Sequence, residues 1–262
     1  MDTINQNVVL IGAGNVATHL GLAFKDAGIP VLQVYSRSLK AAGELAEQIG
    51  CDATDRLEKL SPDAAIYVMA VSDDAIEDVA AAFPYPDKLL VHTSGSVDMQ
   101  ALKKGSRRYG VFYPLQTFTK GRQADFFHIP LCLEVAGQDD RKLLQALAYC
   151  VTDNVAWVSS ETRRQLHVAA VFACNFVNHM YAVAADMMES HGLSFDMLRP
   201  LIAETASKAE EKDPRLVQTG PARRNNTSIL EKHEHMLADQ PAWQKMYHFI
   251  SEDIRKKYNN EQ

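Results

Sequence analysis

Gly12-Ala13-Gly14-Asn15-Val16-Ala17 stands directly after a short apolar run at residues 8–11. This is the glycine-rich fingerprint of dinucleotide-binding βαβ units, in its Gly/Gly/Ala form. Gly12 allows the tight turn from strand to helix, Gly14 lets a pyrophosphate approach the backbone, and Ala17 lets the helix pack close to the strand. The unpaired N–H groups at the start of the helix would bind the phosphates. We therefore expect Gly12, Ala13, Gly14, Asn15 and Val16 to bind a dinucleotide.

The second apolar run, residues 31–35, ends in Ser36-Arg37-Ser38. An NAD site would place Asp or Glu here to accept a hydrogen bond from the ribose 2′-hydroxyl. An arginine between two serines suits a 2′-phosphate instead, because guanidinium binds phosphate oxygens with two parallel hydrogen bonds. The sequence thus favours NADP, bound by Ser36, Arg37 and Ser38. The alternative is that Arg37 is only solvated and Ser38 only caps the next helix.

Short apolar runs alternate with helical patterns through about residue 160. The runs are short and apolar throughout, which is typical of parallel strands covered on both faces. The predicted strands are 8–11, 31–35, 64–70, 89–93, 109–113, 131–136 and 154–158, and the predicted helices are 15–27, 39–49, 73–83 and 139–150. The pattern predicts an α/β fold with a doubly wound, mostly parallel sheet of about eight strands.

From residue 161 the pattern becomes helical, with candidate helices to about residue 191 and over 195–212 and 227–237. We expect a dinucleotide-binding domain over 1–160 and an all-α substrate and dimerisation domain over 161–262. The apolar stretch 168–185 is interrupted by Asn175, Asn178 and His179. These polar groups disfavour a membrane span and favour a buried helix.

Small and polar residues follow two further predicted strands. Val71 and Ser72 come after strand 64–70, and Thr93 and Ser94 come at the end of strand 89–93. Open α/β sheets bind ligands at these carboxyl strand ends, so we expect all four residues to contact the cofactor. His92 is a candidate proton donor there. The alternatives are that Ser72 caps a helix and that His92 is structural.

The first hundred residues resemble Rossmann-fold NADP oxidoreductases related to pyrroline-5-carboxylate reductase and to deazaflavin-dependent NADP oxidoreductases. The resemblance rests on the Gly12 fingerprint, Ser36-Arg37-Ser38 and Val71-Ser72-Asp73. It predicts a Rossmann domain at the N-terminus and implies NADP chemistry without naming a substrate.

Nearly the whole chain is similar to a group of bacterial proteins with a Rossmann-like first domain and a helical second domain like that of 6-phosphogluconate dehydrogenase. The similarity implies a homodimer in which the partner completes the cleft. This chain has Arg224-Asn225-Asn226 where the group usually has Arg-Gly-Asp. The matching pieces are His92-Thr93-Ser94-Gly95, Tyr113-Pro114-Leu115-Gln116-Thr117-Phe118, His167-Val168-Ala169-Ala170, Asn175-Phe176, and Thr219-Gly220-Pro221 with Arg224 and His233.

Two polar features of the second domain could contact a substrate. His167, Asn175 and Asn178 fall within roughly an 80° arc of one helix, which either faces the nicotinamide or pairs with other helices or a dimer partner. Thr219-Gly220-Pro221 with Arg223 and Arg224 forms a loop that could hold a carboxylate or phosphate, or else a solvated surface turn.

The leading hypothesis is an NADP(H)-dependent oxidoreductase that moves hydride between the nicotinamide and a small carbonyl or imine bound between the domains. His92 and His167 are the proton-donor candidates, and Asn175 and Arg224 would position the substrate. The alternative is a non-catalytic NADP-binding sensor or scaffold. A methyltransferase is less favoured because no acidic residue follows the second strand.

The amino-acid composition limits the classes of partner that we expect for this protein. The 27 Lys+Arg and 33 Asp+Glu residues give a net charge of −6, so no broad positive field favours nucleic acid. The polar N-terminus, residues 1–7, has no signal-peptide pattern. We expect a cytoplasmic protein with a small-molecule substrate, and neither a nucleic-acid nor a membrane partner.

No metal site is expected. The four cysteines, Cys51, Cys132, Cys150 and Cys174, include no Cys-x-x-Cys pair and fit reduced core residues. In His233-Glu234-His235 the two histidines stand two positions apart on a predicted helix, so they do not face one ligand.

Overall fold

The computed structural model describes residues 6–122 and 124–259. Most of the N-terminal segment considered above for a signal sequence, residues 1–5, therefore lies outside the described residues. The chain divides into two compact units, Met1–Asn175 and Phe176–Gln262. The domain boundary predicted near residue 160 coincides with the first residue of helix α5, Ser160, which this division assigns to the first unit.

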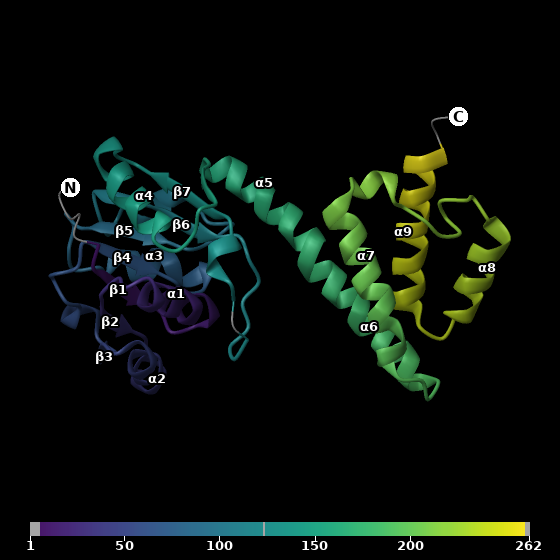
Figure 1. Ribbon diagram of the computed structural model, residues 1–262, viewed down its shortest axis with the longest axis horizontal. Coiled ribbons are helices and arrows are strands. Elements are labelled where there is room, and N and C mark those ends of the chain that lie inside the picture. The colour runs from purple at the N-terminus through teal and green to yellow at the C-terminus, as the bar shows by residue number, and fades with distance from the viewer. Residues whose placement is uncertain (1–5, 123, 260–262) are drawn as a thin grey trace. The chain divides into compact units, whose positions relative to one another are not determined.

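The first unit is built on an eight-stranded sheet in the order β3-β2-β1-β4-β5-β6-β7-β8 (Figure 1). Every neighbouring pair is parallel except β6 and β7. The doubly wound, mostly parallel sheet is thus confirmed. The strands are β1 (Val8–Ile11), β2 (Val31–Tyr35), β3 (Asp52–Thr54), β4 (Ile66–Met69), β5 (Leu89–His92), β6 (Arg108–Pro114), β7 (Leu131–Val135) and β8 (Val155–Trp157).

The strands are apolar throughout because both faces of the sheet are covered. Val8 and Leu10 of β1 belong to one buried cluster, and Val9 and Ile11 belong to another on the opposite face. Successive side chains of a strand point to opposite faces, so each face requires its own apolar set. The helices of this unit are α1 (Asn15–Asp26), α2 (Leu39–Ile49), α3 (Ile76–Ala81), α4 (Arg141–Tyr149) and α5 (Ser160–Ala170).

The second unit is helical, as predicted. After a π-helical segment, Val171–Phe176, come α6 (Val177–Ser190), α7 (Arg199–Glu211), α8 (Thr227–Met236) and α9 (Pro241–Asn259). Among the described residues of this unit, the buried apolar side chains are Ala222, Leu230 and Leu237.

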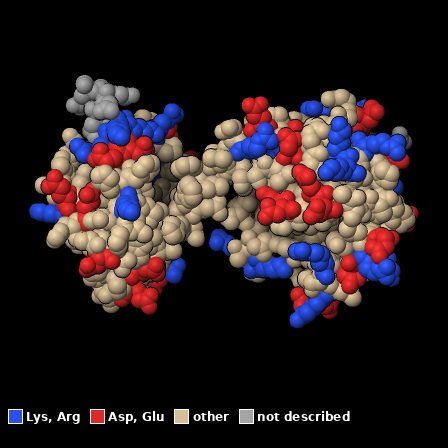
Figure 2. Space-filling model, turned by 180° about the vertical axis from the view of Figure 1, so that it is seen from behind, with Lys and Arg blue, Asp and Glu red and all other residues tan. Residues whose placement is uncertain are grey.

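The prediction of a buried helix over 168–185 is wrong for the single chain. No residue of this stretch is buried, and Val168 and Phe172 are 53% and 64% exposed. The stretch carries no Lys, Arg, Asp or Glu, and Figure 2 shows it in tan while blue and red side chains are mixed over the rest of the visible face. By length and composition alone, the helical run Ser160–Ser190 could cross a membrane, and a single such helix is weak evidence for a span.

The cysteines are only partly core residues. Cys132 is buried, Cys51 and Cys174 are half-buried, and Cys150 is exposed, which corrects the expectation for that residue. Cys150 lies just beyond α4, where its thiol faces Gln6 rather than the core.

Candidate functional site

A cavity of about 420 Å³ opens at the carboxyl ends of β1, β2 and β4. Seven of the residues predicted to bind the cofactor line it: Gly12, Ala13, Gly14, Ser36, Arg37, Val71 and Ser72. Because the three strands are parallel neighbours, their following loops meet at one edge of the sheet. The structure therefore brings together three sequence segments that are up to sixty residues apart.

The two glycines of the fingerprint have different structural roles. Gly12 has φ +125°, and a Cβ added there would lie 2.2 Å from the carbonyl oxygen of Ala70. Gly14 has an extended backbone that any residue can adopt, and no atom lies within 4 Å of the position of its missing Cβ. Gly12 is thus required by the fold, whereas the absent side chain of Gly14 leaves open space beside the start of α1.

The beginning of α1 offers backbone donors. Gly14 occupies the N-cap position, and no side-chain hydrogen bond caps this end of the helix. The first N–H groups of a helix have no partner within the helix and favour an anion. Ala17 is fully buried against the core, as the fingerprint predicts.

Other predicted cofactor residues have structural partners. The Asn15 side chain donates to the Phe118 carbonyl at 2.9 Å, and Val16 packs against the core. Ser38 caps α2 by accepting a hydrogen bond from the Ala41 amide at 3.3 Å. Ser72 precedes the turn Asp73–Ala75 without a capping hydrogen bond. These contacts are all within the protein, so the roles of Asn15, Val16 and Ser38 in binding the cofactor remain predictions.

Two apolar side chains of the cavity were not predicted. Leu57 follows β3, and Val79 lies on α3. Together with Val71 they provide an apolar wall that suits one face of an aromatic base. The sequence offered no signal for them because isolated apolar residues beside short elements look like ordinary core residues.

His92 is enclosed at the end of β5. Its side chain is fully buried, and its Nδ1 accepts a hydrogen bond from the Ser94 amide at 3.1 Å. Burial, and then the positive charge of Arg163, lower the pKa of His92 to about 4. His92 is therefore a neutral, closed-off imidazole at neutral pH.

The residues after His92 form a tight polar turn. The Ser94 hydroxyl accepts hydrogen bonds from the Ser96 and Val97 amides at 3.1 and 3.0 Å. The Thr93 amide donates to the carbonyl of Met69 at 3.1 Å, which continues the pairing with β4. The Ser96 hydroxyl in turn contacts the carboxylate of Asp73.

A second group lies at the end of β6. The hydroxyl of Tyr113 is 3.1 Å from Nδ1 of His167, which lies on α5. A Cβ added at Gly95 would lie 2.5 Å from His167 Nδ1 and 2.8 Å from Tyr113 Cζ. Glycine is thus the residue that leaves room for this pair. Burial raises the pKa of Tyr113 to about 12, so its phenol stays protonated at neutral pH.

Tyr113 is a further residue that the sequence did not identify as part of a site. It is the first residue of the motif Tyr113-Pro114-Leu115-Gln116-Thr117-Phe118. Nothing in the sequence, however, predicts that the end of β6 lies against the middle of α5. Asn175 is exposed at the end of the first unit, and Arg224 is exposed in the second unit beside Gly220. Their roles in positioning a substrate stay predictions.

Within the described ranges, no group of three or more His, Cys, Asp or Glu side chains could hold a metal ion. His233 instead lies 2.8 Å from the hydroxyl of Tyr247 through its Nδ1. Both side chains line an apolar cavity of about 650 Å³ among the helices of the second unit.

Two family models match the chain. The model described as "NADP oxidoreductase coenzyme F420-dependent" matches residues 7–95. A domain of unknown function matches residues 129–254. No curated protein sequence matches the chain.

Solved structures cover almost the whole chain. A "putative NADP oxidoreductase" from Bacteroides fragilis is 41% identical, with a TM-score of 0.91, over 96% of this chain and 98% of that chain. A protein from Thermotoga maritima is 22% identical, with a TM-score of 0.72, over 97% and 99% of the two chains. A reductive aminase from Aspergillus terreus, in complex with NADPH and ethyl-5-oxohexanoate, is 15% identical, with a TM-score of 0.67, over 97% and 96%. The last two likenesses show the shared fold.

Proposed function

We propose a function from one premise: the chain belongs to the family of Rossmann-fold NADP oxidoreductases. The protein is accordingly an NADP-dependent oxidoreductase. Our proposal is that its substrate is a small carbonyl or imine compound, which it reduces with NADPH or forms in the reverse reaction. The fold shared with a reductive aminase and an imine reductase supports this substrate class.

The observation that carries the proposal is the cavity around Gly14. The open space at Gly14 and the uncapped start of α1 fit a pyrophosphate. Arg37, in the same cavity, fits a 2′-phosphate, and Leu57 with Val79 fits the adenine ring. When bound, NADPH supplies the hydride, and the protein supplies orientation and a proton.

We assign the proton to the pair formed by Tyr113 and His167. Because Tyr113 stays protonated, its hydroxyl can donate a hydrogen bond to Nδ1 of His167. The ring proton then lies on Nε2. As hydride adds to the substrate carbon, this proton can pass to the carbonyl oxygen or imine nitrogen while the Tyr113 hydroxyl passes its proton to Nδ1 and regains one from solvent. His92 is closed off from such a substrate by burial, so we assign it a structural role.

A fluorescence titration with NADPH and NADH tests the cofactor site. Gly14→Leu should abolish binding of both nucleotides without unfolding the protein, because the new side chain enters open space that the pyrophosphate needs. Arg37→Ala should lower the preference for NADPH by about tenfold to a hundredfold, the range of one charge-assisted hydrogen bond.

Gly43 provides the matched control. It lies on α2, and no atom lies within 4 Å of the position of its missing Cβ either. Gly43→Leu should bind both nucleotides like the native protein. Normal NADPH binding by Gly14→Leu would refute the site. Binding of NADPH by the native protein without its oxidation by any carbonyl or imine compound would refute the hydride transfer and favour a sensor.

We further propose that the protein is a homodimer in the cytoplasm. The uncharged helical stretch 168–185 is exposed in the single chain, and a second copy offers the same apolar surface. Asn175, Asn178 and His179 interrupt this stretch and would be costly in lipid. All four cysteines are free, which suits a reducing compartment.

A further inference from the structure

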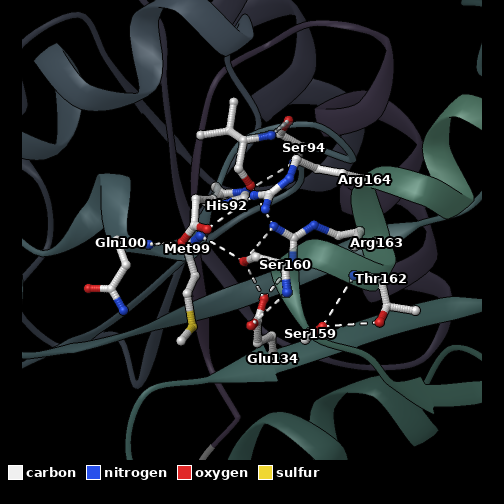
Figure 3. A network of polar contacts seen from close by, with 12 residues as sticks. His92, Ser94, Met99, Gln100, Glu134, Ser159, Ser160, Thr162, Arg163 and Arg164 are labelled. Atoms are coloured by element: carbon white, nitrogen blue, oxygen red, sulfur yellow. Dashed lines mark hydrogen bonds and ion pairs between the residues drawn. The ribbon is translucent and has the colours of Figure 1, made fainter.

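A buried ion pair lies at the first turn of α5, one helical turn before His167. Arg163 has a fully buried side chain, and its Nη1 donates to Glu134 Oε2 at 2.6 Å. Its Nη2 donates to the hydroxyl of Ser160 at 3.1 Å and to the carbonyl of Val97. Figure 3 shows the Arg163 side chain directed towards Glu134 and Ser160.

The carboxylate of Glu134 accepts three hydrogen bonds at this end of α5. Besides Arg163, the amide and the hydroxyl of Ser160 donate to its carboxylate at 2.8 and 2.7 Å. The carboxylate is only 14% exposed. A mostly buried carboxylate with three donors, opposite a fully buried guanidinium, has a fixed geometry, because the guanidinium has no water as an alternative partner.

The sheet register places Glu134 and Tyr113 on the same face. Glu134 of β7 pairs with Val111 of β6, and Tyr113 is two residues further along β6. Paired residues of antiparallel strands share a face, and so do residues two apart on one strand. Val111 and Tyr113 indeed belong to one buried cluster, against which Leu166 of α5 packs.

The spacing on α5 matches the spacing on the sheet. Arg163 and His167 are four residues apart, so they lie on one face of the helix, about 6 Å apart along its axis. Two residues along a strand span about 6.8 Å. Arg163 can therefore contact Glu134 while His167 contacts Tyr113, which gives α5 two attachment points on the same sheet face.

We propose that Arg163 and Glu134 are positioning residues, whose ion pair holds α5 so that His167 stays hydrogen-bonded to Tyr113 above Gly95. The role of the pair in turnover rests on the proposed function, but its effect on the geometry of His167 does not. The tight space around Gly95 makes this positioning strict: His167 Nδ1 would be 2.5 Å from a Cβ at that residue. A small shift of α5 would therefore separate the two rings or force them into the backbone.

The test is the protonation pattern of the His167 ring in the cofactor-free protein. Long-range ¹H–¹⁵N NMR spectra of histidine-labelled protein distinguish the two neutral forms of the ring, and the His167→Asn variant identifies the signals. The native protein should show the ring proton on Nε2. Arg163→Met, which keeps an unbranched apolar stem and removes the charge, should give a mixture of the two forms.

Glu134→Gln is the second variant, because it keeps an oxygen acceptor for Ser160 and is less disruptive if Arg163→Met fails to fold. It should also mix the two ring forms. Turnover should fall by about a hundredfold in both variants, as for a misplaced reacting group, while NADPH affinity stays unchanged because the cavity at Gly14 is not touched.

Arg164→Met is the matched control. Arg164 is the next residue on α5, and it forms an exposed ion pair with Asp98 at 3.1 Å. This variant should keep the native His167 spectrum. A native His167 spectrum in folded Arg163→Met or Glu134→Gln would overturn the proposal. Failure of the native protein to bind NADPH would instead overturn the proposed function and leave the NMR result valid.

Discussion

The Rossmann unit and the helical unit bury their apolar residues to very different extents. The strands β1, β4 and β5 have four residues each, and all of these residues are fully buried. Both faces of the sheet have continuous apolar cores. In the described part of the helical unit, only Ala222, Leu230 and Leu237 are buried apolar residues, while Met197, Leu216 and Met236 are 67%, 81% and 77% exposed. The apolar core of the Rossmann unit is complete within one chain. The second unit presents a surface that another surface can complete.

The largest expected effect is a loss of folding stability when one core residue of each unit is truncated. Comparing the two losses tests the difference between the units. Phe24 is fully buried on α1, with its ring centroid 6.1 Å from that of Phe112. Phe24→Ala should lower the free energy of unfolding of the first unit by about 3–5 kcal/mol. Leu230 lines the cavity of about 650 Å³, so Leu230→Ala should cost only about 2 kcal/mol, because the site is already open.

The two tryptophans allow each unit to be measured separately in urea. Trp157 lies on β8 of the first unit and Trp243 on α9 of the second. Trp243→Phe leaves a reporter for the first unit, and Trp157→Phe leaves one for the second. Equal losses for Phe24→Ala and Leu230→Ala would show that the helical core is as complete as the Rossmann core.

The next effect concerns pH and the closed core at His92. Burial and Arg163 lower the pKa of His92 from 6.5 to about 4, so the unfolded chain binds a proton in this range that the folded chain does not. His92 therefore destabilises the fold as pH falls from 6.5 towards 4, by about 3 kcal/mol in all. At pH 7 this cost is absent.

The measurement is urea unfolding at pH 7 and pH 4.5, followed by Trp157. His92→Asn keeps an acceptor for the Ser94 amide and cannot titrate, so its stability should depend less on pH than that of the native protein. His128→Asn is the control, because His128 is exposed beside Asp125. Equal pH dependence in the native protein and His92→Asn would contradict the closed-off position of this ring.

The sequence predicted which loops meet at one edge of the Rossmann unit, because each cue there is local. The fingerprint, Ser36-Arg37 and Val71-Ser72 each follow a predicted strand, and parallel order brings their loops together. The sequence missed β3 because it has only three residues, Asp52–Thr54, and its first is exposed.

Tertiary contacts could not be predicted in the same way. Tyr113 and His167 are 54 positions apart, and their contact depends on how α5 packs on the sheet. The helical stretch 168–185 has an apolar composition, which indicates that a surface must be covered but not by what. The sequence therefore could not distinguish a helix buried in its own chain from one that a second copy covers.

A charged substitution on this stretch tests the proposed dimer. Val168 on α5 and Leu39 on α2 are both 53% exposed. Val168→Glu should weaken dimerisation by about a hundredfold, which is about 2.7 kcal/mol, because a charge would be buried without a partner. Leu39→Glu should leave dimerisation unchanged. Sedimentation across a range of concentrations measures both, and a native protein that is monomeric at micromolar concentration would refute the dimer.

The smallest expected effect is the loss of folding stability when one helix cap of each unit is removed. Ser38 caps α2 by accepting from the Ala41 amide, and Asn226 caps α8 by accepting from the Ile229 amide at 3.4 Å. Ser38→Ala and Asn226→Ala should each cost about 1 kcal/mol, because a cap stabilises its own helix whether or not the surrounding core is complete. A much smaller cost for Asn226→Ala would show that α8 contributes little stability in its unit.

The same Ser38 variant separates its two candidate roles. If Ser38 only caps α2, Ser38→Ala should bind NADPH with native affinity once the protein is folded. If its hydroxyl also binds the 2′-phosphate, NADPH affinity should fall by about tenfold while NADH affinity stays the same. The capping bond at 3.3 Å uses this hydroxyl only as an acceptor, so its O–H can still donate to a phosphate. We therefore expect the second result, with Arg37 as the main source of the preference for NADPH.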